Sequence, residues 1–178
     1  VFLWTGFDYR GEPTPFTYPA VIGAFGILDA CGFPKYSYPY YLAGWRPELD
    51  VFELCPHWNP VEGGERRCVY LFSRCDEAEL FVGGVSVGRK TIEPYSHAEW
   101  QDVEFVPGEI TAVGYRNGVE VHRKTVATTG PAVALRADVE HLSTDANCFT
   151  WAIIKLSAVD GNGEVVPTAA HPIRISTG

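Results

Sequence analysis

The sequence predicts a mainly β fold, in which immunoglobulin-like β-sandwiches follow the last strand, loop and helix of a (β/α)8 barrel. Its 18 glycines and 13 prolines separate short alternating segments, which is typical of all-β domains. Residues 1–4 are apolar without polar alternation, as in strands buried on both faces of a parallel sheet. A loop rich in Gly, Pro and aromatic residues follows, at the position where a barrel carries its active site.

Residues 1–47 are predicted to be the barrel remnant, and they end in a short helix. Ser37 can cap this helix, and Pro39 suits its first turn. Three apolar residues then share one helix face: Tyr41, Leu42 and Trp45. The Arg46-Pro47 pair ends the helix, because a residue before proline avoids the helical region.

Residues 48–130 are predicted to form one immunoglobulin-like sandwich. Gly83-Gly84 and Asn117-Gly118 indicate hairpins, because both central positions of a type I′ turn need a positive φ. The strands are expected at residues 68–73, 77–82, 85–87, 103–106, 110–115 and 119–126. Six or seven strands within about 80 residues are typical of this fold.

Residues 131–178 are predicted to begin a second sandwich. Thr128-Thr129-Gly130-Pro131 is interpreted as the linker, and Asp160-Gly161-Asn162-Gly163 as a turn. Alternating segments lie at residues 133–139, 151–159 and 173–176. They make up about half of a sandwich of roughly 100 residues, so the chain is expected to stop partway through this domain.

The charge and cysteine content narrow the classes of partner and compartment. Fourteen Lys and Arg against 22 Asp and Glu give a net charge of −8, and no basic cluster occurs, so we expect no nucleic-acid partner and no membrane partner. No apolar stretch approaches the length of a membrane span. The five cysteines are Cys31, Cys55, Cys68, Cys75 and Cys148. Their odd number and irregular spacing favour free thiols in a reducing compartment, and hence the cytoplasm.

Metal binding is the weaker chemical hypothesis, and the sequence requires no cofactor. Cys55 and His57 could chelate a metal, but the second ligand pair that a structural zinc site needs does not follow. We therefore expect a core cysteine and a hydrogen-bonded histidine. The acidic run of Asp76, Glu77 and Glu79 is interpreted as a solvated strand end, with a calcium site as the alternative.

Several motifs follow one another in a fixed order along the chain. They are WTGFDYRGEP (4–13), FGILD (25–29), GFPK (32–35), PHWN (56–59), CDEAELFVGG (75–84) and SVGRK (86–90). Together they resemble glycoside hydrolase family 2, specifically its β-galactosidase-like members. The chain departs from the family pattern at Tyr36, where Asp is frequent, and at Gly83-Gly84, where Asn-Gly is frequent.

The resemblance implies a retaining β-galactosidase whose catalytic barrel precedes trailing sandwiches. Such enzymes use two carboxylates roughly 5–5.5 Å apart. In the family both glutamates lie on earlier barrel strands, so the resemblance implies that this chain contains no catalytic residue and is inactive alone. Pairing Asp8 with Glu12 as a catalytic dyad is the alternative from the residues alone.

Trp4 is the main candidate for binding substrate. It ends the predicted barrel strand, and an indole face suits the C–H-rich face of a pyranose. The resemblance likewise implies an aromatic wall of the sugar pocket, whereas the alternative is a core tryptophan. Phe25 is a second wall candidate, and Asp8 and Glu12 are expected to shape the loop or to contact a sugar hydroxyl.

The substrate class follows from a missing cation. Glucuronidases of the family resemble one another in an Asn-x-Lys sequence that meets the uronate carboxylate. The corresponding residues here are Gly23, Ala24 and Phe25, so a neutral hexoside is favoured and a β-galactoside is the best candidate.

Two other functions remain open. Trp58, Trp100 and Trp151 would serve a carbohydrate-binding module if exposed, although the strand patterns around Trp100 and Trp151 favour core packing. A structural or oligomerisation domain is the third hypothesis. Because a barrel strand without neighbours has two open edges, we expect a homo-oligomer or association through residues 1–47.

Overall fold

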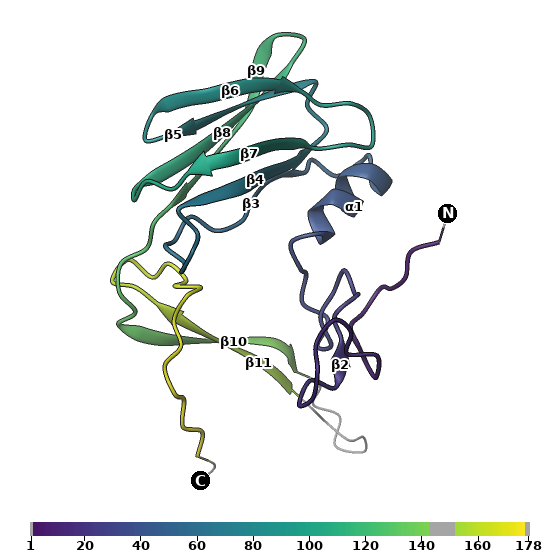
Figure 1. The fold of residues 1–178 in the computed structure, drawn as a ribbon, viewed down its shortest axis with the longest axis vertical. Helices are drawn as coiled ribbons and strands as arrows, with labels where there is room; N and C mark the ends of the chain where they lie inside the picture. The colour runs from purple at the N-terminus through teal and green to yellow at the C-terminus, as the bar shows by residue number, and fades with distance from the viewer. Residues whose placement is uncertain (1, 143–151, 177–178) are drawn as a thin grey trace.

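Seven strands form a sandwich of two antiparallel sheets in the computed structural model, which describes residues 2–142 and 152–176 (Figure 1). The first sheet has the order β3-β4-β7, with β3 at Phe52–Cys55, β4 at Arg66–Ser73 and β7 at Ala98–Glu104. The second has the order β6-β5-β8-β9, with β5 at Glu77–Val82, β6 at Val85–Thr91, β8 at Glu109–Arg116 and β9 at Val119–Ala127. The predicted mainly β fold is confirmed.

Two tight turns set the register of the four-stranded sheet. Gly83 and Gly84 have φ of 55° and 81°, and Asn117 and Gly118 have φ of 51° and 78°. These are the positive values that a type I′ hairpin requires, so both predicted hairpins are confirmed. β5 also has the predicted bounds.

One sandwich strand was placed wrongly by the sequence. The strand expected at residues 103–106 lies at Ala98–Glu104. Ala98 and Trp100 point into the core, while Glu99 and Gln101 face outward. The charged residues of its outer face interrupt the apolar run on which the prediction was based, so the strand was placed too late in the sequence.

The sandwich core lies between the two sheets and is almost fully closed. Trp58, Leu71, Leu80 and Ile110 are at most 1% exposed. The indole N–H of Trp58 donates to the backbone oxygen of Val106 at 2.8 Å, so its one polar group is satisfied inside the core. Trp100 is 3% exposed and donates in the same way to the backbone oxygen of Gly88, so its predicted core position is confirmed.

The predicted helix is present as α1, at Tyr38–Trp45. The backbone N–H of Arg46 donates to Leu42 at its end, as the sequence predicts. Ser37 occupies the N-cap position but its side chain makes no capping hydrogen bond, so that prediction was wrong; its backbone is already helical, whereas a capping residue is normally extended. Tyr40 packs α1 edge-on against Phe72, on the outer face of β4.

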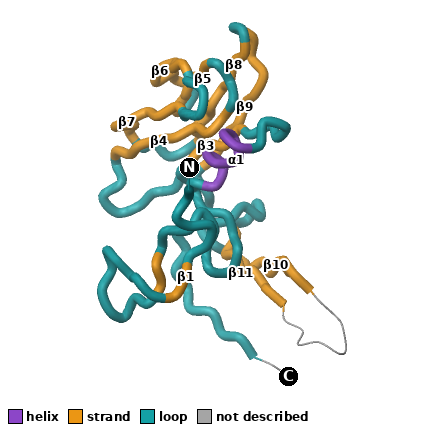
Figure 2. The backbone as a smooth tube through the Cα atoms, turned by 90° about the vertical axis from the view of Figure 1, so that its right-hand side faces the viewer, coloured by secondary structure: helices purple, strands orange, loops and turns teal. Residues whose placement is uncertain are grey.

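The segment before α1 is loop rather than barrel strand (Figure 2). Residues 2–4 of the predicted strand pair with no described segment, and Phe2 is fully exposed. A strand requires hydrogen bonds to a neighbour, and none of the described segments supplies them. The regular structure here is a pair of two-residue strands, β1 at Tyr9–Arg10 and β2 at Ile22–Gly23.

A two-stranded ribbon follows the sandwich, with β10 at Ala134–Leu142 paired to β11 at Ala152–Val159. The predicted turn at residues 160–163 is present, but the expected strand at 173–176 is not formed, because no described segment pairs with it. Trp151 and Cys148 lie outside the described residues. The boundaries predicted at 47/48 and 130/131 stay predictions.

The linker is held from both sides. Oδ1 of Asn59, a residue of the PHWN motif, accepts the backbone N–H of Thr129 at 3.0 Å and its hydroxyl at 2.8 Å. Oδ2 of Asp160 accepts the backbone N–H of Gly130 at 2.9 Å. Asn59 and Asp160 are 3% and 4% exposed, so both clamps are shielded from water.

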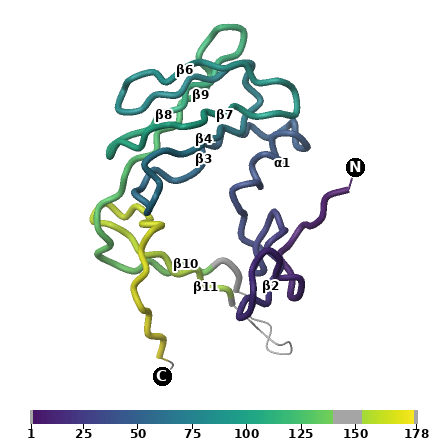
Figure 3. Tube along the Cα trace, in the orientation of Figure 1, coloured from purple at the N-terminus to yellow at the C-terminus, as the bar shows by residue number. Residues whose placement is uncertain are grey.

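The ribbon then extends below the sandwich towards the N-terminal loop (Figure 3). Nζ of Lys155 lies 5.5 Å from the ring centroid of Phe33, which brings β11 against the GFPK motif. Within residues 2–142 and 152–176, no helix has the length and apolarity of a membrane span.

Candidate functional site

The candidate site is built on a loop unit, defined here as residues 5–35. Backbone hydrogen bonds join Asp8 to Leu28 at 2.9 Å, Leu28 to Gly6 at 3.0 Å and Lys35 to Ile27 at 3.0 Å. Two distant motifs, WTGFDYRGEP and FGILD, are thereby held side by side.

Gly26 makes this close approach possible. A Cβ atom at this position would lie 2.2 Å from the backbone nitrogen of Asp8 and 2.4 Å from the backbone oxygen of Leu28. Both are backbone atoms that cannot move independently of the loop. Only glycine fits between the two motifs.

Asp8 serves the scaffold of this loop unit. Its Oδ1 accepts Nζ of Lys35 at 2.9 Å and the backbone N–H of Gly26 at 2.8 Å, and Oδ2 lies 3.2 Å from the same ammonium. The side chain is 11% exposed. The hydrogen bond from Lys35 lowers the pKa of Asp8 below its ordinary value, so the carboxylate stays ionised.

Lys35 has no donor left for a ligand. A lysine ammonium carries three N–H donors. Two contacts go to the carboxylate of Asp8, and the third goes to the backbone oxygen of Ala24 at 3.0 Å. A cation therefore lies beside residue 24, but its charge and its hydrogen bonds are used within the loop unit.

Aromatic side chains form the exposed part of the site. Trp4 is 73% exposed, and its indole N–H donates to the hydroxyl of Tyr9 at 3.3 Å. The two rings are 5.9 Å apart and nearly perpendicular, at 79°. Phe25 also lies near Tyr9, with its ring centroid 6.3 Å from that of Tyr9. Trp4, Tyr9 and Phe25 are called the aromatic row below.

Glu12 stands at the edge of the aromatic row. Its Oε2 accepts the hydroxyl hydrogen of Tyr9, and this hydrogen bond raises the pKa of Tyr9. Oε1 of Glu12 has no hydrogen-bond donor among the described residues. The carboxylate is exposed beside Trp4, so it can accept a hydrogen bond from a ligand.

The structure thus separates the four predicted site residues into two groups. Trp4, Phe25 and Glu12 gather around Tyr9, whereas Asp8 faces Lys35 and lies away from solvent. Their roles in binding stay predictions. Tyr9 was not predicted as a site residue. The sequence feature that could have identified it is an amphipathic aromatic residue two positions before the Gly-Glu turn.

The other candidate ligand groups are buried or bonded within the protein. Nδ1 of His57 is buried but has no hydrogen-bond partner among the described residues, so the prediction of a hydrogen-bonded histidine was wrong. Burial raises the pKa of the Cys55 thiol to about 11, and burial lowers the pKa of His57. Asp76 accepts the backbone N–H of Asn117 at 2.7 Å, and Glu77 pairs with Arg89. Where the chain is described, no three His, Cys, Asp or Glu side chains gather as metal ligands would.

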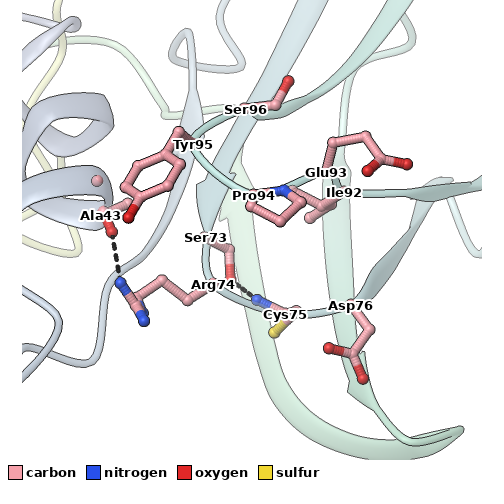
Figure 4. A pocket seen from close by; sticks show the side chains of 11 residues that line it. Ala43, Ser73, Arg74, Cys75, Asp76, Ile92, Glu93, Pro94, Tyr95 and Ser96 are labelled. Atoms are coloured by element: carbon pink, nitrogen blue, oxygen red, sulfur yellow. Dashed lines mark hydrogen bonds between the residues drawn. The ribbon is translucent and has the colours of Figure 1, made fainter.

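In the described part of the chain, two cavities are lined by residues of α1, and neither contains a residue of the aromatic row. One, of about 410 Å³, is mainly aromatic and is lined by Tyr40, Tyr70, Phe72 and His97, among others. The second, of about 240 Å³, lies between α1 and the 73–76 and 92–96 loops (Figure 4). Arg74, one of its polar residues, donates to the backbone oxygen of Ala43.

Comparisons with known proteins cover nearly the whole chain. A family model described as a domain of unknown function (DUF4982) matches residues 64–122. Beta-galactosidase BoGH2A of Bacteroides ovatus is 35% identical over 177 residues, which is 98% of this chain and 20% of that protein. The chain therefore spans about a fifth of the length of this relative.

Solved structures give the same result. A beta-glycosidase from Bacteroides vulgatus matches 92% of this chain with a TM-score of 0.73 and 30% identity, over 21% of its own length. A beta-glucuronidase from glycoside hydrolase family 2 matches 83% of the chain with a TM-score of 0.72 and 27% identity, over 16% of its length.

The two packed antiparallel sheets define most of this chain as a β-sandwich. Over nearly its whole length the chain is similar to proteins of glycoside hydrolase family 2, as its motifs predict.

Proposed function

We propose that the complete protein is a retaining β-glycosidase and that this chain supplies one wall of its sugar pocket together with accessory sandwiches. The observation that supports this most is the exposed Trp4 with Glu12 beside it, in a chain similar to proteins of glycoside hydrolase family 2. An aromatic face next to a hydrogen-bond acceptor matches a pyranose, which has C–H groups on its face and hydroxyls at its edge.

The substrate class follows from the charges around the aromatic row. Glu12 is joined to Trp4 through the hydroxyl of Tyr9, and Lys35 is neutralised by Asp8. A uronate carboxylate beside Glu12 would meet a like charge, which Lys35 cannot compensate because it is paired with Asp8. A neutral hexoside, and first a β-galactoside, is therefore the favoured substrate.

A β-glucuronide is the second candidate substrate. The similarity to a beta-glucuronidase at 27% identity favours it. It would require a cation at the aromatic row, supplied either by Arg10, which is exposed next to Tyr9 on β1, or by a part of the protein outside this chain.

Parallel assays on the complete protein test both candidates. We expect turnover of nitrophenyl β-galactoside, little turnover of the matching glucuronide, and a severe loss of kcat/KM in Trp4→Ala. Trp45→Ala is the matched control, because Trp45 is also exposed, at 57%, but lies on α1. Normal kinetics of Trp4→Ala, or a preference for the glucuronide, would overturn this assignment.

The isolated chain is proposed to be inactive, because the family resemblance implies that both catalytic glutamates lie on earlier barrel strands. A clean preparation of residues 1–178 should not hydrolyse nitrophenyl β-galactoside. Turnover that disappears in Asp8→Asn or Glu12→Gln would place the catalytic pair in this chain instead.

Association through residues 1–47 is proposed from their exposed apolar side chains. Phe2, Phe16 and Tyr18 are 103%, 58% and 89% exposed. Exposed apolar side chains of this size favour self-association. Light scattering at several concentrations should show growth in mass that a Phe16→Ser/Tyr18→Ser double variant reduces, whereas a monomer at every concentration would exclude it.

A further inference from the structure

Tyr9 connects the two exposed side chains of the candidate site. A tyrosine hydroxyl can donate one hydrogen bond and accept two. Its single proton goes to Oε2 of Glu12, and it accepts the indole N–H of Trp4 at 3.3 Å. The direction of this chain is therefore fixed, from Trp4 through Tyr9 to Glu12.

Tyr9 is also the anchored member of the three. It lies on β1, where it pairs with Gly23 of β2, and its ring contacts Phe25. It is half-buried, whereas Trp4 and Glu12 are exposed. Two side chains that have few other contacts are thus oriented by one that the backbone pairing holds in place.

The hydrogen bonds decide what each exposed group can offer a ligand. The indole N–H of Trp4 is used by Tyr9, so Trp4 presents only its ring face. Oε2 of Glu12 is used as well, which leaves Oε1 as an acceptor. The combination fits a ligand that stacks a C–H face and donates a hydroxyl at the edge.

The backbone at Glu12 gives an independent indication that its side chain is used. Glu12 has φ of 38°, in the left-handed region that glycine adopts without strain. Residues held in this region are strained and cluster at functional sites. A glutamate here places a carboxylate at the edge of the aromatic row, which glycine would not.

We propose that Tyr9 is a positioning residue that fixes the indole plane of Trp4 and directs Oε1 of Glu12 to a hydroxyl of the sugar stacked on that plane. This inference rests on the proposed function. It makes Glu12 the hydroxyl acceptor of the site and gives the site its preference for neutral sugars over uronates.

The main experiment compares Tyr9→Phe with Tyr18→Phe. Both substitutions remove one hydroxyl, and Tyr18 is 89% exposed. In the complete protein, Tyr9→Phe should lower kcat/KM for nitrophenyl β-galactoside by about 10-fold, the loss expected for one or two hydrogen bonds. Tyr18→Phe should leave it unchanged.

Nuclear magnetic resonance of the 178-residue chain reports the orientation directly. In Tyr9→Phe the indole N–H resonance of Trp4 should shift, because its acceptor is lost, while those of the buried Trp58 and Trp100 stay in place. Methyl β-galactoside should then bind more weakly than to the unaltered chain.

Glu12→Gly separates a binding role from a structural one. Glycine relieves the strained φ, so the variant should melt at the same temperature or higher and yet lose kcat/KM by about 10-fold or more. A purely structural glutamate would lose thermal stability along with activity, which would overturn the inference.

The outcomes distinguish this inference from the proposed function. If the unaltered complete protein hydrolyses no glycoside, the proposed function fails and this inference fails with it. If the unaltered protein is active but Tyr9→Phe has unchanged kcat/KM and an unshifted Trp4 resonance, only the positioning role fails.

Discussion

The sandwich and the loop unit of residues 5–35 are stabilised in different ways. In the sandwich, Trp58, Leu71 and Leu80 are completely buried, and the core extends through both sheets. In the loop unit the only fully buried residues are Gly23 and Gly26, so no apolar side chain forms a core there. Hydrogen bonds and the ion pair of Asp8 with Lys35 hold it instead.

This difference indicates that stability and ligand binding depend on different regions of the chain. Burial of apolar surface is the dominant favourable term in folding, so the stability of the chain comes from the sandwich. The candidate binding side chains lie on the part with the fewest buried contacts, which opens at low free energy. Stability and binding should therefore respond to different substitutions.

The largest expected difference comes from one substitution made in both regions. Trp58→Ala should lower the free energy of unfolding by about 3–5 kcal/mol, because the truncated side chain leaves a cavity in the core. Trp4→Ala should lower it by less than about 0.5 kcal/mol, because Trp4 is exposed. Urea denaturation measures both values, and a comparable loss in the two variants would show that the loop unit contributes to the core.

Gly26→Ala should disrupt the loop unit alone. The added Cβ would meet two backbone atoms, and overpacking of this kind costs about 1–3 kcal/mol. Hydrogen exchange should become faster for residues 5–35 while the amides of β4 and β5 stay protected. Gly6→Ala is the control, since nothing lies within 4 Å of its Cβ position; equal effects would contradict the close-approach argument.

Protonation of Asp160 at acid pH should weaken the contact that holds the ribbon to the linker. Backbone N–H groups, first that of Gly130, lower its pKa below the ordinary value. Its contribution to stability is thus present above the unfolded-state pKa of about 3.9 and is lost as the pH falls through the lower folded-state pKa. Hydrogen exchange in β10 and β11 should increase below about pH 4, and Asp160→Asn should remove that pH dependence. An unchanged pH profile in Asp160→Asn would assign the acid sensitivity elsewhere.

The smallest effect is expected at Gly44, near the end of α1. Its Cβ position is 3.8 Å from the ring of Tyr95, an ordinary contact. Gly44→Ala should raise the free energy of unfolding by about 0.5 kcal/mol, because alanine has fewer unfolded conformations. Thermal melts measure this, and a loss of stability would indicate that α1 is packed more tightly than its exposed residues imply.

The sandwich was largely predictable because its information is local. Gly83-Gly84 and Asn117-Gly118 mark turns without reference to the rest of the chain. β3, by contrast, was not predicted, because four residues with a central glutamate show little alternation. The glutamate at position 53 is explained only by its partner in the fold, Lys124 of β9, which donates to its carboxylate.

The candidate site was predictable as a list of residues but not as an arrangement. Trp4, Phe25 and Glu12 were named from their positions and chemistry. The sequence could not show that Asp8 pairs with Lys35, 27 positions away, or that Tyr9 joins Trp4 to Glu12. These contacts depend on how the loop folds back, which no local pattern encodes.

The order of the four-stranded sheet also has a consequence for folding kinetics. β5 with β6 and β8 with β9 are local hairpins, whereas the central pair joins Glu77 to Tyr115 and Val82 to Ile110. Hairpins form within about 1–10 μs, but non-local pairing must first close a long loop. The rate-limiting step should therefore be the docking of two preformed hairpins. Substitutions in β5 and β8 should slow refolding, whereas substitutions in the turns should mainly change the population of each formed hairpin.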